Sequence, residues 1–182
     1  MIRKLTYDEI IAERKTIEEF KQTNKHPITV ILHNIRSLYN VGSFFITCDS
    51  AFISELILTG YTPKPPRPEI EKTALGATQT VYWKYSTNIL EEIENQKEKG
   101  KKVFAVEITN KKRYYDSLLP EEFPICLIFG NELTGLEDKI ITKCNDSLEI
   151  PMYGVKHSLN VSVSGGIVIY EAVKAFYKYL NK

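Results

Sequence analysis

Short runs of β-branched and other apolar residues, separated by segments of helical pattern, constrain the fold of this chain more than any other feature. The clearest runs cover residues 28–33 and 55–59, and further strand candidates cover 81–85, 102–108, 125–129 and 147–150. Runs of this length are typical of strands buried in a sheet. Because most of them are separated by stretches that could be helical, the sequence predicts an α/β fold.

Three segments carry the end signals of helices. Thr6 and Glu9 form the Thr-x-x-Glu pattern of a capping box, which predicts a first helix from there to about residue 24. Residues 86–100 begin with cap residues, carry Glu early and Lys late, and end on glycine, as a surface helix does. The last helix is predicted over 161–180. In contrast, residues 60–68 are too rich in proline for a helix or a strand.

The composition is that of one ordinary globular domain. The chain has 182 residues, of which 43% are hydrophobic and 26% charged, and its formal net charge is +1. This balance gives no overall argument for a nucleic-acid partner, although a local basic face would suffice for one. No apolar stretch approaches 18 residues, and the first residues lack the apolar block of a signal peptide. We therefore expect a cytoplasmic protein without a membrane segment.

The three cysteines, Cys48, Cys126 and Cys144, are odd in number and show no C-x-x-C spacing. This pattern argues against a disulfide framework and against a zinc ribbon. We expect buried free thiols and no metal site.

The densest cationic and aromatic cluster lies at residues 110–115, which read Asn-Lys-Lys-Arg-Tyr-Tyr. Such a cluster suits RNA, because cations contact phosphates and aromatic rings stack on unpaired bases. The alternative is an exposed loop whose tyrosines fold back on the core.

The usual nucleotide-binding motifs are missing from the sequence, which has neither G-x-G-x-x-G after the first strand nor G-x-x-x-x-G-K-[ST]. Three glycine- and amide-rich turns remain, at the strand ends where open α/β sheets bind ligands. The first, residues 34–43, contains Asn40, which could begin a phosphate-binding helix or serve only as its N-cap. The second, residues 129–136, places Glu132 among glycines, where a carboxylate can hold a ligand or serve as a cap.

The third turn, residues 150–166, is the most unusual. It leads into a helix that opens with small polar groups and contains the adjacent Gly165 and Gly166. Each glycine costs a helix about 1 kcal/mol of propensity relative to alanine. We therefore expect a close backbone approach there, either to a ligand or in tight packing of the helix on the sheet.

In order, these three turns resemble the three motifs of the SpoU (TrmH-like) branch of the SPOUT RNA methyltransferases. The first motif corresponds to residues 40–42 and the helix that follows, the second to 129–136, and the third to 150–163. The similarity covers roughly residues 28–175, and residues 72–77 also resemble a segment of one subgroup.

The resemblance implies a SPOUT-type fold, a mostly parallel sheet flanked by helices, whose part at about 124–175 is threaded as a trefoil knot. The whole chain, 1–182, would be a single methyltransferase domain, with 1–27 as a helical extension. That extension is too short for a separate RNA-binding domain, so the catalytic domain would bind RNA itself. The resemblance further implies a homodimer.

The implied cofactor is S-adenosyl-L-methionine, held largely by backbone atoms of the second and third motifs. Carried over, this places it against Gly130, Ile150 and Leu159, with Met152 and Asn160 nearby. The implied reaction transfers its methyl group to a ribose 2′-hydroxyl of tRNA or rRNA, which requires positioning and a base. The family roles suggest that the site is organised by Asn40, Glu132, Ser158 and Asn160, with Arg36 beside it.

One departure from the family pattern concerns the base. Six residues after Asn40 the family has an arginine, usually assigned as the base that acts on the 2′-hydroxyl, whereas this chain has Ile46. An aliphatic side chain can neither accept a proton nor pair with a phosphate. Arg36, His33 and His157 are the candidates to replace it.

Two other functions stay open at this point. The first is a knotted protein that binds S-adenosylmethionine or RNA but is catalytically impaired because of Ile46. The second is an unrelated small-molecule enzyme, for example of flavodoxin-like fold, which would have no affinity for S-adenosylmethionine.

Overall fold

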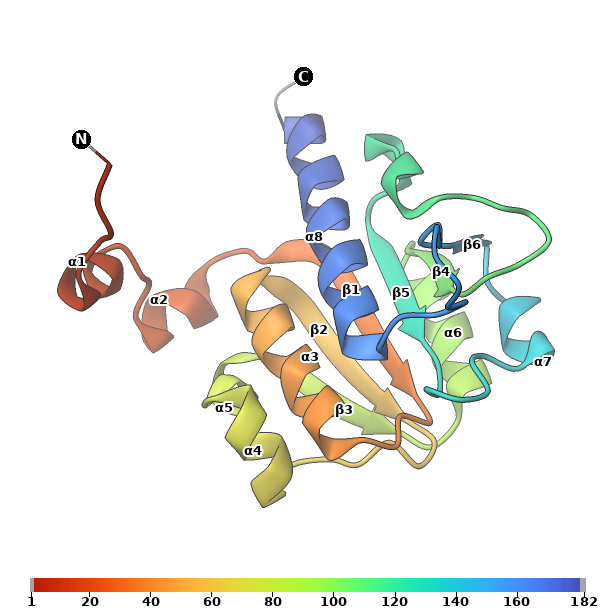
Figure 1. The fold of residues 1–182 in the computed structure, drawn as a ribbon, viewed down its shortest axis with the longest axis horizontal. Coiled ribbons are helices and arrows are strands. Elements are labelled where there is room, and N and C mark those ends of the chain that lie inside the picture. Colours follow the sequence, from red (N-terminus) through yellow and green to blue (C-terminus); the bar gives the residue numbers. More distant parts are fainter. Residues whose placement is uncertain (1, 181–182) are drawn as a thin grey trace.

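The computed structural model describes residues 2–180, and its centre is a six-stranded sheet in which every pair of neighbours is parallel (Figure 1). The strand order is β3-β2-β1-β5-β4-β6. The strands are β1 (His26–His33), β2 (Ile53–Thr59), β3 (Trp83–Ser86), β4 (Lys102–Val106), β5 (Ile125–Phe129) and β6 (Asp146–Leu148). The predicted α/β class is therefore confirmed, and each expected strand is present with its ends shifted by a few residues.

Helices cover both faces of the sheet. They are α1 (Tyr7–Ala12), α2 (Ile17–Gln22), α3 (Leu38–Ser50), α4 (Pro68–Ala74), α5 (Ala77–Thr80), α6 (Ile89–Glu98), α7 (Asp138–Ile141) and α8 (Val161–Leu180). Alternate residues of the strands point to opposite faces. Val30 and Leu32 pack in the larger core with α3 and α8, whereas Ile31 packs in the smaller core with α6 and α7.

The glycine pair of the third turn lies within α8 and is partly explained by packing. A Cβ on Gly165 would overlap the ring of Phe44 on α3, far inside any real contact. Gly165 is thus needed for the close approach of α8 to α3. A Cβ on Gly166 would meet nothing within 4 Å.

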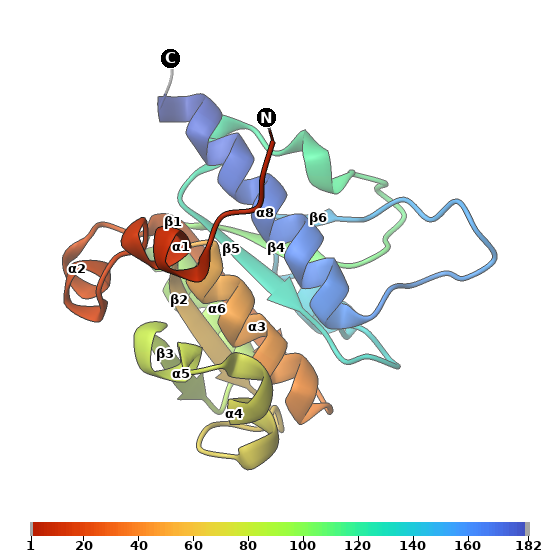
Figure 2. The ribbon, with the colours of Figure 1, turned by 60° about the vertical axis from the view of Figure 1, so that its left-hand side comes forward.

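The single N-terminal helix expected over residues 6–24 is wrong, because the chain forms two helices there. Thr6 and Glu9 cap α1 as predicted, but Thr16 and Glu19 form a second capping box that begins α2. Both helices lie at the side of the sheet and pack little against it (Figure 2). The signal for the break, a second Thr-x-x-Glu pattern, is present in the sequence.

The three cysteines are free thiols, as expected, although only Cys48 and Cys126 are fully buried and Cys144 is half-buried. Burial raises the pKa of Cys144 to about 12 and shifts the pKa values of the other two thiols upward as well. None of the helices in residues 2–180 has the length and apolarity required to cross a bilayer.

Candidate active site

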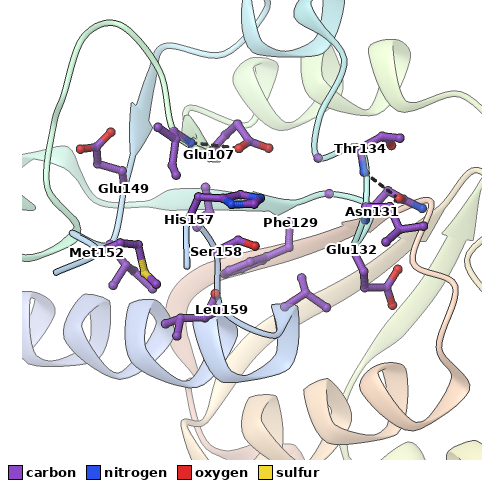
Figure 3. Close-up of a pocket in the computed structure, with 18 of the residues that line it drawn as sticks. Glu107, Phe129, Asn131, Glu132, Thr134, Glu149, Met152, His157, Ser158 and Leu159 are labelled. Atoms are coloured by element: carbon purple, nitrogen blue, oxygen red, sulfur yellow. Dashed lines mark hydrogen bonds between the residues drawn. The ribbon is translucent and has the colours of Figure 1, made fainter. Parts of the chain in front are cut away.

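A cavity of about 450 Å³ opens at the carboxyl ends of β4, β5 and β6 (Figure 3). Its wall is formed by residues 106–108, 129–135, 148–150 and 157–159, with Met152, Val161 and Ser164. It therefore joins the second turn, which follows β5, and the third turn, which follows β6; only β4 lies between these two strands in the sheet. This is the place where open α/β sheets bind ligands, and the volume is within the range of small-molecule sites.

Gly130 and Gly135 shape the turn on one side of the cavity. A Cβ on Gly130 would lie 2.6 Å from the carbonyl carbon of Gly135, so even alanine would force the backbone apart. Gly135 has a positive φ of 63°, which other residues rarely adopt. The turn can therefore be this tight only with glycine at these positions.

Glu132 connects this turn to the loop before α3. Its carboxylate accepts hydrogen bonds from the backbone N–H groups of Arg36 (2.9 Å) and Ser37 (3.0 Å) and from the amide of Asn40 (3.0 Å). Partial burial opposes ionisation of Glu132, but these hydrogen bonds outweigh it and lower its pKa. Glu132 is therefore a fixed anion that holds the first turn against the second.

Asn40 and Asn160 extend this connection to the third turn. The amide of Asn160 donates to the side-chain oxygen of Asn40 at 3.2 Å. The oxygen of Asn160 in turn accepts from the backbone of Ser162 at 2.9 Å and so caps the start of α8. A continuous path of hydrogen bonds thus joins all three turns through Glu132, Asn40 and Asn160.

The expectation that Asn40 caps a helix is wrong. Ser37 is the N-cap of α3, and its hydroxyl accepts the N–H of Asn40 at 3.3 Å. Asn40 therefore lies inside the first turn of the helix, where its side chain is free to bridge Glu132 and Asn160.

The structure distributes the predicted site residues between two adjacent places. Gly130, Glu132, Ile150, Met152, Ser158 and Leu159 line the cavity. Asn40 and Asn160 lie next to it in the hydrogen-bond path, and the backbone of Arg36 is held there by Glu132, with its side chain exposed. Ile46 is not among the residues that line the cavity, and it packs half-buried against the larger core.

The two histidines considered as substitutes for the missing base differ sharply. His33 is buried, its Nδ1 lies 2.9 Å from the hydroxyl of Thr59, and its Nε2 lies 3.0 Å from the amide of Asn34. Since the amide is a donor, Nε2 must be unprotonated, and burial lowers the pKa of His33 further. His33 is therefore a structural residue. His157, in contrast, is exposed and lines the cavity (Figure 3).

The sequence analysis missed Glu107, which follows β4 and lines the cavity. Its carboxylate accepts the backbone N–H groups of Ile108 and Leu136, both at 3.0 Å, and so fixes the far side of the 130–136 turn. The available signal was a lone carboxylate directly after an apolar strand, the same pattern that drew attention to Glu132.

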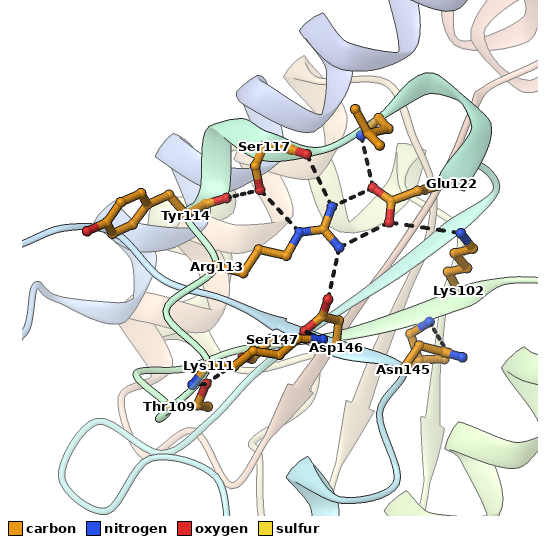
Figure 4. A network of polar contacts seen from close by, with 12 residues as sticks. Lys102, Thr109, Lys111, Arg113, Tyr114, Ser117, Glu122, Asn145, Asp146 and Ser147 are labelled. Carbon is orange, nitrogen blue, oxygen red and sulfur yellow. Dashed lines mark hydrogen bonds and ion pairs between the residues drawn. The ribbon is translucent and has the colours of Figure 1, made fainter.

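The cationic cluster at 110–115 is mostly occupied by internal contacts (Figure 4). Arg113 donates to both oxygens of Glu122, to Asp146 at 3.0 Å, and to Ser117. Tyr115 packs against the core, and Lys111 pairs with Asp146 at 2.9 Å. For Arg113 and Tyr115 the interpretation as a loop folded on the core is therefore correct, and the guanidinium is not free for phosphate.

Replacing Glu132 with Gln is expected to lower the free energy of unfolding by roughly 1–3 kcal/mol, because an amide cannot accept from all three donors. Because the pKa of Glu132 is lower in the folded protein, its carboxylate stabilises the fold at pH values above 4.5, the pKa in the unfolded chain. This stabilisation is lost as the pH falls through the lower pKa of the folded state. The unfolding temperatures of wild type and Glu132→Gln should differ most near neutral pH and become similar in acid. A difference independent of pH would contradict this role of the ionised carboxylate.

Comparisons with known proteins agree with this arrangement. The family model described as the SpoU rRNA Methylase family matches residues 27–170. The tRNA (guanosine(18)-2′-O)-methyltransferase of Thermus thermophilus is 27% identical over 161 residues, which cover 88% of this chain and 81% of the relative. The 23S rRNA (guanosine-2′-O-)-methyltransferase RlmB of Vibrio vulnificus is 27% identical over 173 residues, which cover 91% of this chain and 69% of the relative.

Solved structures show the same fold. The crystal structure of the Aquifex aeolicus TrmH/SpoU tRNA modifying enzyme superposes with a TM-score of 0.80 at 25% identity, covering 89% of this chain and 81% of that one. An AdoMet-bound rRNA methyltransferase from Sinorhizobium meliloti superposes with a TM-score of 0.76 at 24% identity, covering 83% of this chain and 57% of that one. With a family match that spans all three turns and most of the sheet, the chain belongs to the SpoU rRNA methylase family.

Proposed function

We propose that this protein is an S-adenosylmethionine-dependent methyltransferase that acts on a ribose 2′-hydroxyl of tRNA or rRNA. The observation that carries this proposal is the path of hydrogen bonds through Glu132, Asn40 and Asn160, which fixes all three family motifs around one cavity. The relatives named above are 2′-O-methyltransferases of tRNA and of 23S rRNA.

The cavity fits the cofactor in size and in chemistry. Its wall offers aliphatic side chains such as Ile150 and Leu159 for a purine, and the glycine turn from Gly130 to Gly135 also lines it. In addition, Oε2 of Glu149 on the wall is buried without a hydrogen-bond partner among the described residues. A hydroxyl or ammonium group of a ligand would satisfy such an oxygen.

When bound, S-adenosylmethionine supplies an electrophilic methyl group. The chain must orient the ribose and accept the proton of its hydroxyl. We assign orientation to Asn40, Asn160 and Ser158, because the first two are held rigidly and Ser158 lies on the cavity wall. Glu132 is a positioning residue, because its carboxylate holds the amide of Asn40 in place.

Proton removal is assigned to His157. The guanidinium of Arg36 stays protonated in proteins, which suits it for contact with a phosphate rather than for the role of a base. Of the three carboxylates on the wall, Glu107 and Glu132 are each held by two or more N–H donors, and Glu149 is assigned above to a hydroxyl or ammonium group of the cofactor. His157 is an exposed imidazole on that wall, and imidazole is well suited to accept protons near neutral pH.

The alternative of an impaired binding protein rests on Ile46 alone. The presence of His157 in the cavity and the activities for which the relatives are named favour an active enzyme. The same family pattern supports a single domain over 1–182, a trefoil knot at about 124–175, and action in the cytoplasm, where RNA and the methyl donor are found.

We also propose a homodimer. Val163, Tyr170 and Tyr177 of α8 lie seven residues apart and therefore on one face, and about half of each side chain is exposed. An apolar stripe of this kind is typical of an interface. Sedimentation should give a dimer at micromolar concentration, and Tyr170→Glu should shift it toward monomer. A monomeric wild type would contradict the proposal.

The function is tested with RNA extracted from a host strain that lacks this gene. Purified protein and radiolabelled S-adenosylmethionine should transfer label to that RNA, and mapping should find one 2′-O-methylated nucleotide that is missing in the deletion strain. Transfer to a base atom, or no transfer although cofactor binds, would overturn the assignment. Failure of S-adenosylhomocysteine to bind at millimolar concentration would remove the cofactor as well.

A further inference from the structure

Tyr61 combines an exposed ring with an anchored hydroxyl. It follows β2 in the turn at Gly60, and 62% of its surface is exposed. Its phenol oxygen accepts a hydrogen bond of 2.7 Å from the amide of Asn131, a residue of the cavity wall. A ring that faces solvent is rarely needed for the stability of the fold. Because the hydroxyl group holds this ring in one place, the ring can bind a ligand without being ordered first.

The backbone around Tyr61 is fixed on both sides. The hydroxyl of Tyr85 donates to the carbonyl of Gly60 at 2.6 Å, and the backbone N–H of Tyr61 donates to the side chain of Asn34 at 3.1 Å. Thr62, which is buried, bonds to the carbonyl of Leu32 at 3.1 Å. Since the ring is held before any ligand arrives, little conformational entropy would be lost when one binds.

Asn131 places the ring next to the site. The same amide that contacts Tyr61 also donates to the carbonyl of Asn34 at 2.8 Å, two residues before Arg36. The ring is thus one side chain away from the cavity and beside the loop held by Glu132.

Three cationic side chains belong to the loop of Tyr61 and to the neighbouring loop. Arg36 lies in the neighbouring loop, and Lys64 and Arg67 follow Tyr61 in the same loop. All three side chains are exposed, and within residues 2–180 none of them forms an ion pair. The ammonium group of Lys64 lies over the ring of Tyr85, 4.3 Å from its centroid.

We propose that Tyr61 is a stacking platform for an unpaired nucleobase of the RNA substrate, next to the nucleotide that is methylated, with Arg36, Lys64 and Arg67 contacting its phosphates. Unpaired bases stack on aromatic side chains, and the flanking phosphates need cations. The inference rests on the proposed function and adds a statement about its substrate: the target lies in a loop or another unpaired region, not within a duplex.

The test compares Tyr61 with Tyr82, which has the same exposed fraction of 62% but lies before β3, at the amino ends of the strands and away from the cavity. RNA from the deletion strain serves as the probe. Tyr61→Ala should weaken RNA binding, and raise KM for RNA, by about 5- to 150-fold, the range found for removal of one base stack. Its kcat and its affinity for S-adenosylhomocysteine should stay near wild type, and Tyr82→Ala should change none of these values.

Tryptophan variants give a direct readout of stacking. Tyr61→Trp should bind RNA about as well as wild type, and the fluorescence of the added indole should be quenched as RNA is titrated, whereas Tyr82→Trp should show no quenching. Equal RNA affinity of Tyr61→Ala and wild type, or unquenched indole fluorescence of Tyr61→Trp in the bound complex, would overturn the inference while leaving the methyltransferase assignment intact. A wild type that neither binds nor methylates RNA would overturn both.

Discussion

Gly130→Ala is expected to weaken the binding of S-adenosylmethionine by about 100-fold or more. The added Cβ would lie 2.6 Å from the carbonyl carbon of Gly135 and 2.8 Å from the side chain of Leu136, so the turn that forms one wall of the cavity must open. A displacement of about 1 Å in a binding site can cost a factor of 10². Calorimetric titration with S-adenosylhomocysteine measures the loss without requiring turnover.

The matched control is Gly166→Ala in α8, where the new Cβ meets nothing within 4 Å. This variant should bind the ligand normally, and the helix should become slightly more stable, by up to about 1 kcal/mol. If a folded Gly130→Ala variant bound S-adenosylhomocysteine as well as wild type does, cofactor binding would not depend on this turn.

His157→Gln is expected to reduce kcat for RNA methylation by about 10²–10⁴-fold, the usual contribution of a positioned base. Glutamine keeps a polar side chain at this position of the cavity wall but accepts no proton. The loss should therefore appear in kcat, whereas KM for RNA should change little. Binding of S-adenosylhomocysteine should change little.

Arg36→Ala separates proton removal from substrate positioning. The loss of a phosphate contact should raise KM for RNA and leave kcat near the wild-type value. If Arg36→Ala instead lowered kcat at unchanged KM, or if His157→Gln retained full kcat, the roles assigned to these two residues would be wrong.

Strand positions and the three turns could be predicted from sequence because they depend on local pattern. Residues 28–33 and 125–129 are short, largely apolar runs of the length and composition typical of buried strands, and Gly130 and Glu132 lie just after the second run. The break between α1 and α2 was equally local, and the capping box at Thr16 should have indicated it.

Partnerships between distant residues could not be predicted in this way. The side chain of Asn40 bridges Glu132, 92 residues away, and Asn160, 120 residues away, and no local pattern indicates either partner. In the same way, Arg113 has the appearance of an RNA-binding residue in the sequence, but Asp146, 33 residues away, lies within reach of its guanidinium once β4 and β6 have paired. A short stretch of sequence shows which chemical groups a side chain carries, but the tertiary fold decides which residue becomes its partner.

The order of the strands in the sheet has a consequence for folding of the nascent protein. During synthesis, β1, β2 and β3 can pair as soon as they emerge, because they are neighbours both in the chain and in the sheet. The hydrogen bonds from Arg36 to Glu132 and from Asn160 to Asn40 span 96 and 120 residues, so they form only after nearly the whole domain has left the ribosome. An incomplete chain can therefore acquire half of its sheet early, but it cannot hold the methyl donor before translation of α8.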